Sequence, residues 1–98
     1  MATPPLEILP TAVEEALEAA RWYRERSPKA ALAFQVEIRA AFDRIQNNPQ
    51  AWMRHHHGTR RLLLGRFPYE VVYRIFPHVV LIVAIAHCRR RPGYWRER

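Results

Sequence analysis

The chain has 98 residues, which is the size of one small domain with a single hydrophobic core. Hydrophobic residues make up 49% and charged residues 26%, a globular composition that excludes a wholly disordered chain. The formal net charge of +7 favours a polyanionic partner: nucleic acid, an acidic protein segment or a membrane surface. We therefore expect one domain over residues 1–98.

The positive charge is concentrated in the second half of the chain. Residues 1–50 contain six basic and seven acidic residues, whereas residues 51–98 contain ten arginines against Glu70 and Glu97, a formal charge of +8. Arginine forms bidentate contacts with phosphates and carboxylates and stacks on aromatic rings. We expect this basic half to carry the function.

Cysteine usage and hydropathy indicate the compartment. The single cysteine, Cys88, excludes an intrachain disulfide and fits a reducing environment. The N-terminus has no basic segment followed by an apolar one, so no signal peptide is expected. The longest apolar run, residues 79–86, is too short to span a bilayer. We expect a cytoplasmic protein with no membrane partner.

The N-terminal segment predicts a short strand and then a helix. Residues 6–9, closed by Pro10, have the composition of a short edge strand. Thr11 and Glu14 have the spacing of a capping box, which predicts that the helix begins at Thr11. The expected core-facing stripe is Val13, Ala16, Leu17, Ala20 and Tyr23, with Glu15, Glu18, Arg21 and Arg26 left to solvent.

A second helix is predicted to start at Ser27 and Pro28, because Ser is a good N-cap and Pro fits the first helical position. Its expected apolar stripe is Phe34, Ile38, Ala41, Phe42 and Ile45. The Asn-Asn-Pro sequence at 47–49 ends it. Two helices joined this tightly predict an antiparallel hairpin.

Strand patterns fill the second half of the chain. Residues 49–58 show no period and predict a loop, whereas residues 60–64, 69–76 and 79–88 are rich in β-type residues and predict an antiparallel meander. The last strand is apolar on both faces, which predicts a central strand covered by the helices on one side and by another segment on the other. The expected fold is α+β: a short strand and a helix hairpin packed on a meander, with a basic C-terminal tail.

The strongest candidate site is that tail. Arg89, Arg90 and Arg91 precede a Pro-Gly turn and then Tyr94 and Trp95. Guanidinium groups bind phosphates and aromatic rings stack on unpaired bases, so this pattern is typical of a nucleic-acid surface. In the alternative interpretation, the two rings fold back to cover the sheet.

Other candidate residues carry weaker signals. His87 and Tyr94 could serve as general base or acid in metal-free RNA cleavage, although a histidine beside a buried strand is more often structural. Histidines 55–57 lack metal-ligand spacing, so a solvated loop is expected, with no metal and no cofactor. Trp22, Tyr23 and Trp52 are expected to line the core or a groove.

Three motifs in order resemble the ParE branch of the RelE/ParE toxin superfamily. They are Trp22-Tyr23 with Arg26-Ser27-Pro28, then Phe67-Pro68-Tyr69-Glu70-Val71-Val72-Tyr73-Arg74, then Ala86-His87 with Arg89-Arg90-Arg91-Pro92-Gly93-Tyr94-Trp95. The resemblance implies a single toxin domain over 1–98 from a type II toxin–antitoxin, or plasmid stabilisation, module. It also implies a cognate antitoxin whose extended C-terminal part wraps the toxin, and an acidic, initially disordered segment suits a chain this basic.

The resemblance narrows the target as well, because RelE-like members cleave messenger RNA on the ribosome and ParE-like members inhibit DNA gyrase. In the nuclease branches a basic residue precedes a hydrophobic-hydrophobic-Tyr motif, whereas here Glu70 precedes it, and another nuclease arginine falls on Cys88. A carboxylate cannot stabilise developing phosphate charge. We therefore expect a binding inhibitor of gyrase with no catalytic residues. Its expected target-binding residues are Arg89, Arg90, Arg91, Tyr94 and Trp95.

Two alternatives stay open at this point. The first is a ribosome-dependent, metal-independent mRNA endonuclease that uses Arg61, His87, Arg90 and Tyr94. The second is a degenerate toxin that acts in regulation together with its antitoxin.

Overall fold

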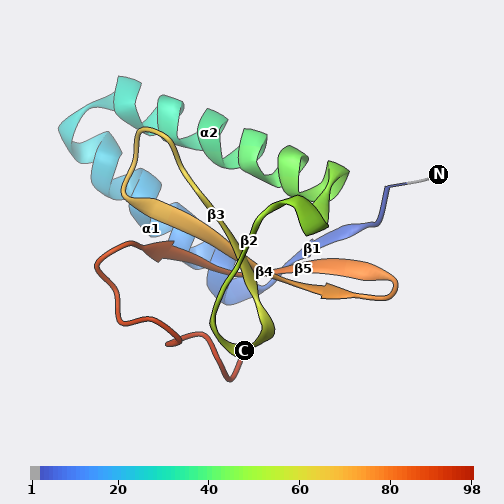
Figure 1. Cartoon of the computed structure of the whole chain (residues 1–98). Helices are drawn as coiled ribbons and strands as arrows, with labels where there is room; N and C mark the ends of the chain where they lie inside the picture. The colour runs from blue at the N-terminus through green and yellow to red at the C-terminus, as the bar shows by residue number, and fades with distance from the viewer. Residues whose placement is uncertain (1–2) are drawn as a thin grey trace.

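Two helices and a mixed sheet build the α+β fold expected from the sequence, in a computed structural model that describes residues 3–98. The elements in chain order are β1 (Leu6–Ile8), α1 (Pro10–Arg26), α2 (Pro28–Asn47), η1 (Pro49–Ala51), β2 (Met53–Arg54), η2 (His56–Gly58), β3 (Arg60–Leu63), β4 (Tyr69–Phe76) and β5 (Val79–His87), where η marks a 3-10 helix (Figure 1). Neither α-helix of the described chain is long and apolar enough to cross a membrane.

The five strands lie in the order β1-β5-β4-β3-β2. Strands β2 to β5 pair antiparallel, as the predicted meander requires, and β1 pairs parallel to β5 with Leu6 opposite Val80. Strand β5 therefore lies between β1 and β4, which confirms the predicted central position. The prediction of a loop over 49–58 was wrong in part, because Met53 and Arg54 pair with β3. A two-residue strand is too short to show an alternating pattern.

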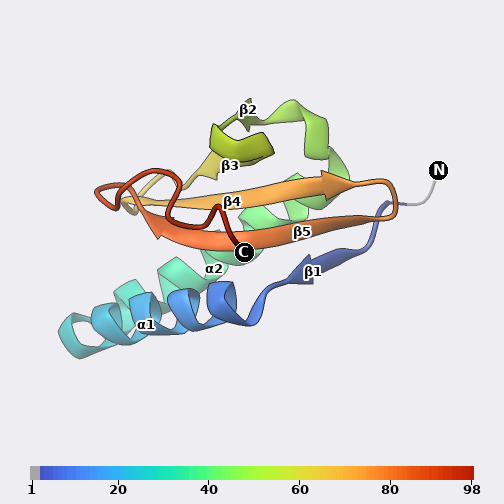
Figure 2. The ribbon, with the colours of Figure 1, turned by 90° about the horizontal axis from the view of Figure 1, so that it is seen from below.

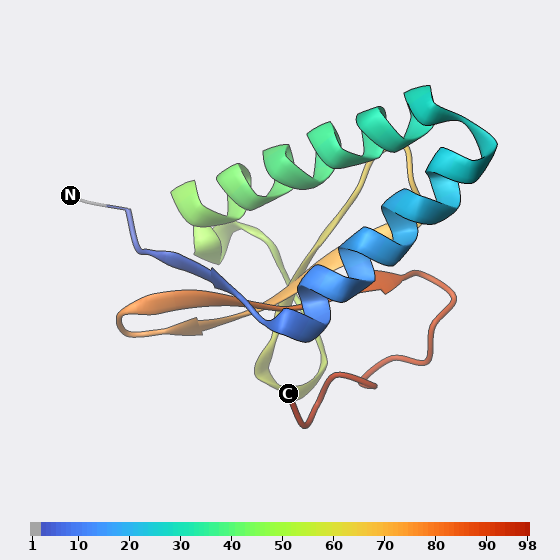
Figure 3. The same cartoon turned by 180° about the vertical axis from the view of Figure 1, so that it is seen from behind.

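Both helices pack on one face of the sheet, as Figure 2 shows from below and Figure 3 from behind. The predicted cap at Ser27 is present, since the backbone N–H of Ala30 donates to its hydroxyl oxygen at 3.2 Å. The core between helices and sheet contains the predicted stripe of α2 and an aromatic group in which Phe34 contacts Tyr23, Phe67 and Tyr69.

The predicted start of α1 was wrong, and its predicted stripe was wrong in part, because Ala16, Ala20 and Tyr23 pack on the core but Val13 and Leu17 do not. The helix begins one residue earlier, with Pro10 at its first position and Leu9 as an N-cap that has no side-chain hydrogen bond. Thr11 thus lies inside the first turn and cannot form the expected capping box. Small side chains face the sheet instead of the predicted Val13 and Leu17, which are 41% and 56% exposed. The buried residues are Ala12, Ala19 and Ala20, whose size lets α1 approach β5 closely.

Candidate target-binding site in the C-terminal tail

The C-terminal tail, residues 88–98, turns back over the sheet face that the helices leave open (Figure 2). Successive turns hold it: the backbone N–H of Arg90 donates to the His87 carbonyl at 2.9 Å, and that of Arg96 donates to the Gly93 carbonyl at 3.0 Å. Gly93 has φ of +84°, a left-handed conformation that glycine adopts without steric cost. The tail is therefore an ordered part of the domain.

Trp95 anchors the tail. Its side chain is only 1% exposed and packs in a second hydrophobic cluster with Val72, Val83, Ala84 and Ala86. The ring also stacks on His55, with centroids 5.0 Å apart. The expectation that Trp95 contacts a target conflicts with this burial, and the alternative interpretation, in which the ring covers the sheet, describes its position.

Tyr94 and two arginines converge on Glu15, which projects from α1. The Tyr94 hydroxyl donates to one carboxylate oxygen at 2.6 Å, and the Arg98 guanidinium donates to the other at 2.8 Å. The Arg90 guanidinium lies 3.9 Å from the same carboxylate and 4.0 Å above the Tyr94 ring. Burial, and then the bond to Glu15, raise the pKa of Tyr94 far above its usual value. Tyr94 is therefore a neutral donor that supports Arg90.

Glu15 also closes a gap in the sheet. Strand β1 pairs only with residues 80–82 of β5, so the following part of that edge has no neighbouring strand. There the backbone N–H of Ile85 donates to Glu15 at 3.0 Å, and the Val83 carbonyl accepts from Arg98 at 3.0 Å. These side chains satisfy backbone groups that would otherwise stay unpaired. Sequence reasoning left Glu15 to solvent, because nothing local connects it to residues about seventy positions away.

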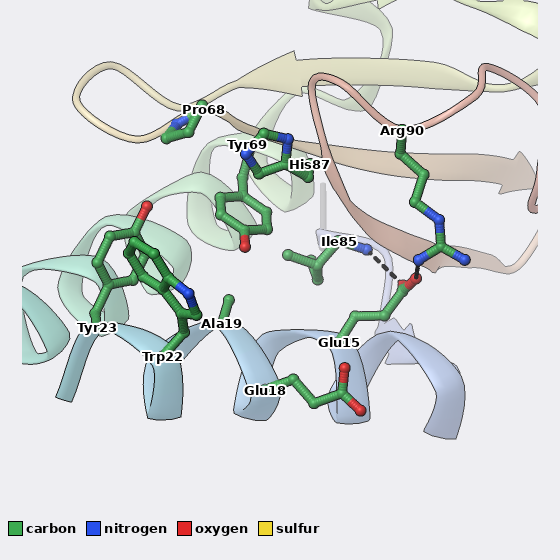
Figure 4. A pocket seen from close by; sticks show the side chains of 10 residues that line it. All are labelled: Glu15, Glu18, Ala19, Trp22, Tyr23, Pro68, Tyr69, Ile85, His87 and Arg90. Atoms are coloured by element: carbon green, nitrogen blue, oxygen red, sulfur yellow. Dashed lines mark hydrogen bonds and ion pairs between the residues drawn. The ribbon is translucent and has the colours of Figure 1, made fainter. Parts of the chain in front are cut away.

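A pocket of about 430 Å³ lies beside Glu15, between α1 and the ends of β4 and β5 (Figure 4). Its wall includes Trp22 and Tyr23, which matches their predicted groove-lining position, and also Tyr69, His87 and Arg90. The His87 ring packs edge-on against Tyr69, and its Nδ1 accepts from the backbone N–H of Arg89 at 3.0 Å. Burial raises the pKa of Tyr23 and of Tyr69 above the usual value, so neither side chain forms a phenolate near neutral pH.

Three of the four residues of the nuclease alternative contact one of two carboxylates, Glu70 or Glu15. Arg61 donates to Glu70 at 3.1 Å, and Glu70 is only 7% exposed. Arg90 and Tyr94 are engaged by Glu15, whereas His87 faces the pocket. The structure therefore brings His87, Arg90 and Tyr94 near one another, while Arg61 is neutralised elsewhere by a carboxylate.

Neither Cys88 nor the histidine run forms a reactive centre. Cys88 is exposed as a residue, but partial burial of its thiol, and then the nearby Glu70, raise the pKa of that thiol, which disfavours the nucleophilic thiolate. His55 is not solvated as expected, because its side chain is enclosed beside Trp95 with its Nε2 atom 3.7 Å from Glu70. Within residues 3–98, no group of three or more His, Cys, Asp or Glu side chains could hold a metal ion.

Arg89 and Arg91 are the two arginines of the expected site that form no ion pair in the described chain. Both side chains are exposed, and neither has a carboxylate within 4.0 Å in the described chain. Together with Arg90 they present three positive charges on an anchored segment. Such a surface can bind phosphates or carboxylates of a macromolecule.

Comparison with known proteins agrees with this fold. The family model described as ParE toxin of type II toxin-antitoxin system, parDE, matches residues 6–92. A solved structure described as the chromosomal ParDE TA system from P. aeruginosa superposes with a TM-score of 0.77 at 23% sequence identity, covering 87% of this chain and 96% of that one. No curated protein sequence matches the chain. The chain belongs to the ParE toxin family of type II toxin–antitoxin systems.

Proposed function

We propose that this chain acts in the cytoplasm as the toxin of a toxin–antitoxin module and that it inhibits DNA gyrase by binding it through the C-terminal tail. Family membership supports the toxin assignment, and the superposed P. aeruginosa structure is described as a ParDE toxin–antitoxin system. The gyrase target is the one that the ParE resemblance implies. The tail supplies an anchored, positively charged surface for it.

The pairing of Arg61 with Glu70 is the single observation that favours binding over RNA cleavage. Stabilising a pentacoordinate phosphate requires cationic groups aimed at the developing negative charge. Here the Arg61 guanidinium is occupied by a buried carboxylate at 3.1 Å, which would repel a phosphate at the same place. A cleavage centre that used Arg61 would have to break this ion pair first.

The anchored tail suits a binding inhibitor. Burial of Trp95 and the bonds of Tyr94 to Glu15 order the backbone that carries Arg89, Arg90 and Arg91. Association costs less when the contacting segment is already ordered. In this proposal the three arginines contact the target, while Tyr94 and Trp95 hold them in place.

We place the antitoxin on the opposite side of the molecule, along α2 and the edge of the sheet. Val36 on α2 and Leu63 on β3 are exposed and line a hollow of about 320 Å³, whose lining also includes Arg44 and the ion pair of Arg66 with Glu37. Arg44 has no carboxylate within 4.0 Å in the described chain, and an exposed apolar strip beside this cation suits an amphipathic, acidic segment that orders on binding.

Expression from a tightly controlled promoter tests the proposed target. A gyrase inhibitor should cause filamentation and a DNA-damage response while messenger RNAs stay intact. Messages cut at ribosomal A-site codons would show instead that the chain is a nuclease. A neighbouring gene should encode a short antitoxin with a DNA-binding N-terminus.

The Arg90→Ala variant tests the role of the tail. Toxicity should fall about tenfold or more, because the variant removes an ordered cation from the target surface. Antitoxin affinity should change by less than about twofold, and Val36→Glu should show the converse pattern. Equal losses of both activities in Arg90→Ala would mean that the tail is chiefly an antitoxin-binding surface.

A further inference from the structure

The arginines of the basic half fall into two classes. Of the ten arginines in residues 51–98, four lie within 4.0 Å of a carboxylate. These are Arg61, Arg66, Arg90 and Arg98. The other six have no such partner in the described chain, so their charge is not neutralised locally. Several of these six converge at one place.

That place is the contact between η2 and the tail, two segments far apart in sequence. The Arg74 guanidinium donates to the backbone carbonyl of His57 and, at 3.4 Å, to that of Arg96. His57 also lies against Gly93 so closely that a Cβ atom there would be 2.7 Å from its Nε2. Because both acceptors are neutral backbone carbonyls, they do not offset the positive charge of Arg74 at the junction.

An open hollow of about 540 Å³ lies at this junction. The residues that line it include His57, Arg91 and Arg96, and one acidic residue, the exposed Glu97. We name His57, Arg74, Arg91 and Arg96 the basic patch. The Arg54 side chain lines a second hollow, of about 430 Å³, which also includes Gly58 of η2. Cationic groups thus line both hollows that include a residue of η2.

We infer that the basic patch binds the phosphate backbone of duplex DNA. Single-stranded nucleic acid is bound by exposed aromatic rings on which bases stack, but Trp95 is buried, and the half-buried Tyr94, which lines the hollow, already has the Arg90 guanidinium over its ring. A protein partner is normally held by an apolar centre, and the large exposed hydrophobic side chains lie outside the patch. Separated guanidinium groups around a hollow whose lining includes no large exposed hydrophobic side chain suit phosphates along a duplex.

The expected signature is electrostatic. Each phosphate neutralised changes the slope of log K against log salt by about −0.9. Contacts from Arg74, Arg91 and Arg96 therefore predict a slope of about −2 to −3 and no sequence preference. The inference concerns the toxin alone and does not require gyrase, so its failure would leave the proposed function untouched.

Fluorescence anisotropy of the purified 98-residue chain with a mixed-sequence duplex of about 20 base pairs, between about 50 and 200 mM salt, measures this binding. The double variant Arg91→Ala/Arg96→Ala should lose at least about tenfold in affinity and flatten the slope by about 2. The double variant Arg91→Lys/Arg96→Lys should retain most of both. Circular dichroism confirms that each variant is folded.

The matched control is Arg21→Ala/Arg39→Ala, which removes the same charge from exposed positions of α1 and α2. It should change duplex affinity by less than about threefold. If both double alanine variants lost the same affinity for the duplex, the loss would reflect net charge alone, and this result would overturn the inference. Absence of duplex binding at about 50 mM salt, or tighter binding of a single-stranded RNA or an oligoglutamate competitor, would also overturn it.

Discussion

Glu15 connects the tail to α1, so its removal is the sharpest perturbation of this architecture. The carboxylate accepts from the Tyr94 hydroxyl at 2.6 Å, from Arg98 at 2.8 and 3.3 Å, and from the Ile85 backbone N–H at 3.0 Å. Glu15→Ala deletes all of these acceptors. It also leaves the Ile85 N–H unpaired at an edge that β1 does not cover.

The free energy of unfolding should fall substantially. A hydrogen bond to a charged group contributes about 1.5–3 kcal/mol, and a buried donor left unpaired costs about 1–3 kcal/mol. These contributions do not add, because the Arg98 guanidinium lies near the surface and regains water when its partner is lost. We expect a loss of about 2–4 kcal/mol, which lowers Tm by about 10–20 °C in a domain of this size.

Urea and thermal unfolding followed by circular dichroism measure this loss. Glu14→Ala is the matched control, since it removes the same charge from an exposed position of the same helix that forms no ion pair in the described chain. The control should stay within about 0.5 kcal/mol of wild type. A Glu15→Ala loss no larger than that of the control would refute the reasoning.

Three further changes probe how the tail is seated. Trp95→Ala should lower the free energy of unfolding by about 3–5 kcal/mol, and Trp95→Phe by less than half of that, in urea titrations; equal losses would argue against packing as the cause. Gly93→Ala should lower Tm more than Gly65→Ala, because Gly93 has φ of +84° and its Cβ would meet a histidine ring, whereas Gly65 does not have positive φ. Burial outweighs the attraction of Glu70 and lowers the pKa of His55 below 6.5. The unfolded chain therefore binds this proton more readily, and stability falls as pH decreases through the unfolded value toward the folded one. His55→Phe keeps a ring against Trp95 without titrating, so it should lose less stability than wild type between about pH 7.5 and 5.5, and an identical pH profile would contradict this assignment.

Local signals in the sequence predicted much of the fold. The second helix could be placed because Ser27 and Pro28 mark its start and its apolar residues repeat at helical spacing. Strands β4 and β5 were predicted from runs of β-branched and aromatic residues. Pattern was less reliable in α1, where alanines face the sheet and the larger Val13 and Leu17 do not. Ala16, Ala20 and Tyr23 of the predicted stripe do pack on the core, so helical spacing placed the stripe near the buried face but displaced it toward larger side chains that are exposed.

The candidate site depended on contacts that no local pattern encodes. The pattern of α1 predicts that Glu15 faces solvent, but in the folded chain Arg98 and Tyr94 donate hydrogen bonds to it. The sequence around Trp95 likewise predicts a ring that stacks on bases, whereas in the structure the tail folds over the sheet and buries this ring. In contrast, the importance of Glu70 could be predicted from its place in a motif, and its ion pair with Arg61 supplies the physical reason.

Inhibition of purified DNA gyrase by the purified chain tests the central claim most directly. Supercoiling of relaxed plasmid should be blocked by the wild type and restored when Arg89, Arg90 and Arg91 are all replaced by alanine. A triple variant of the exposed helix arginines Arg21, Arg24 and Arg39 should still inhibit, because it removes the same charge elsewhere. Undiminished supercoiling at saturating wild-type chain, with transcripts cleaved on purified ribosomes, would contradict the account.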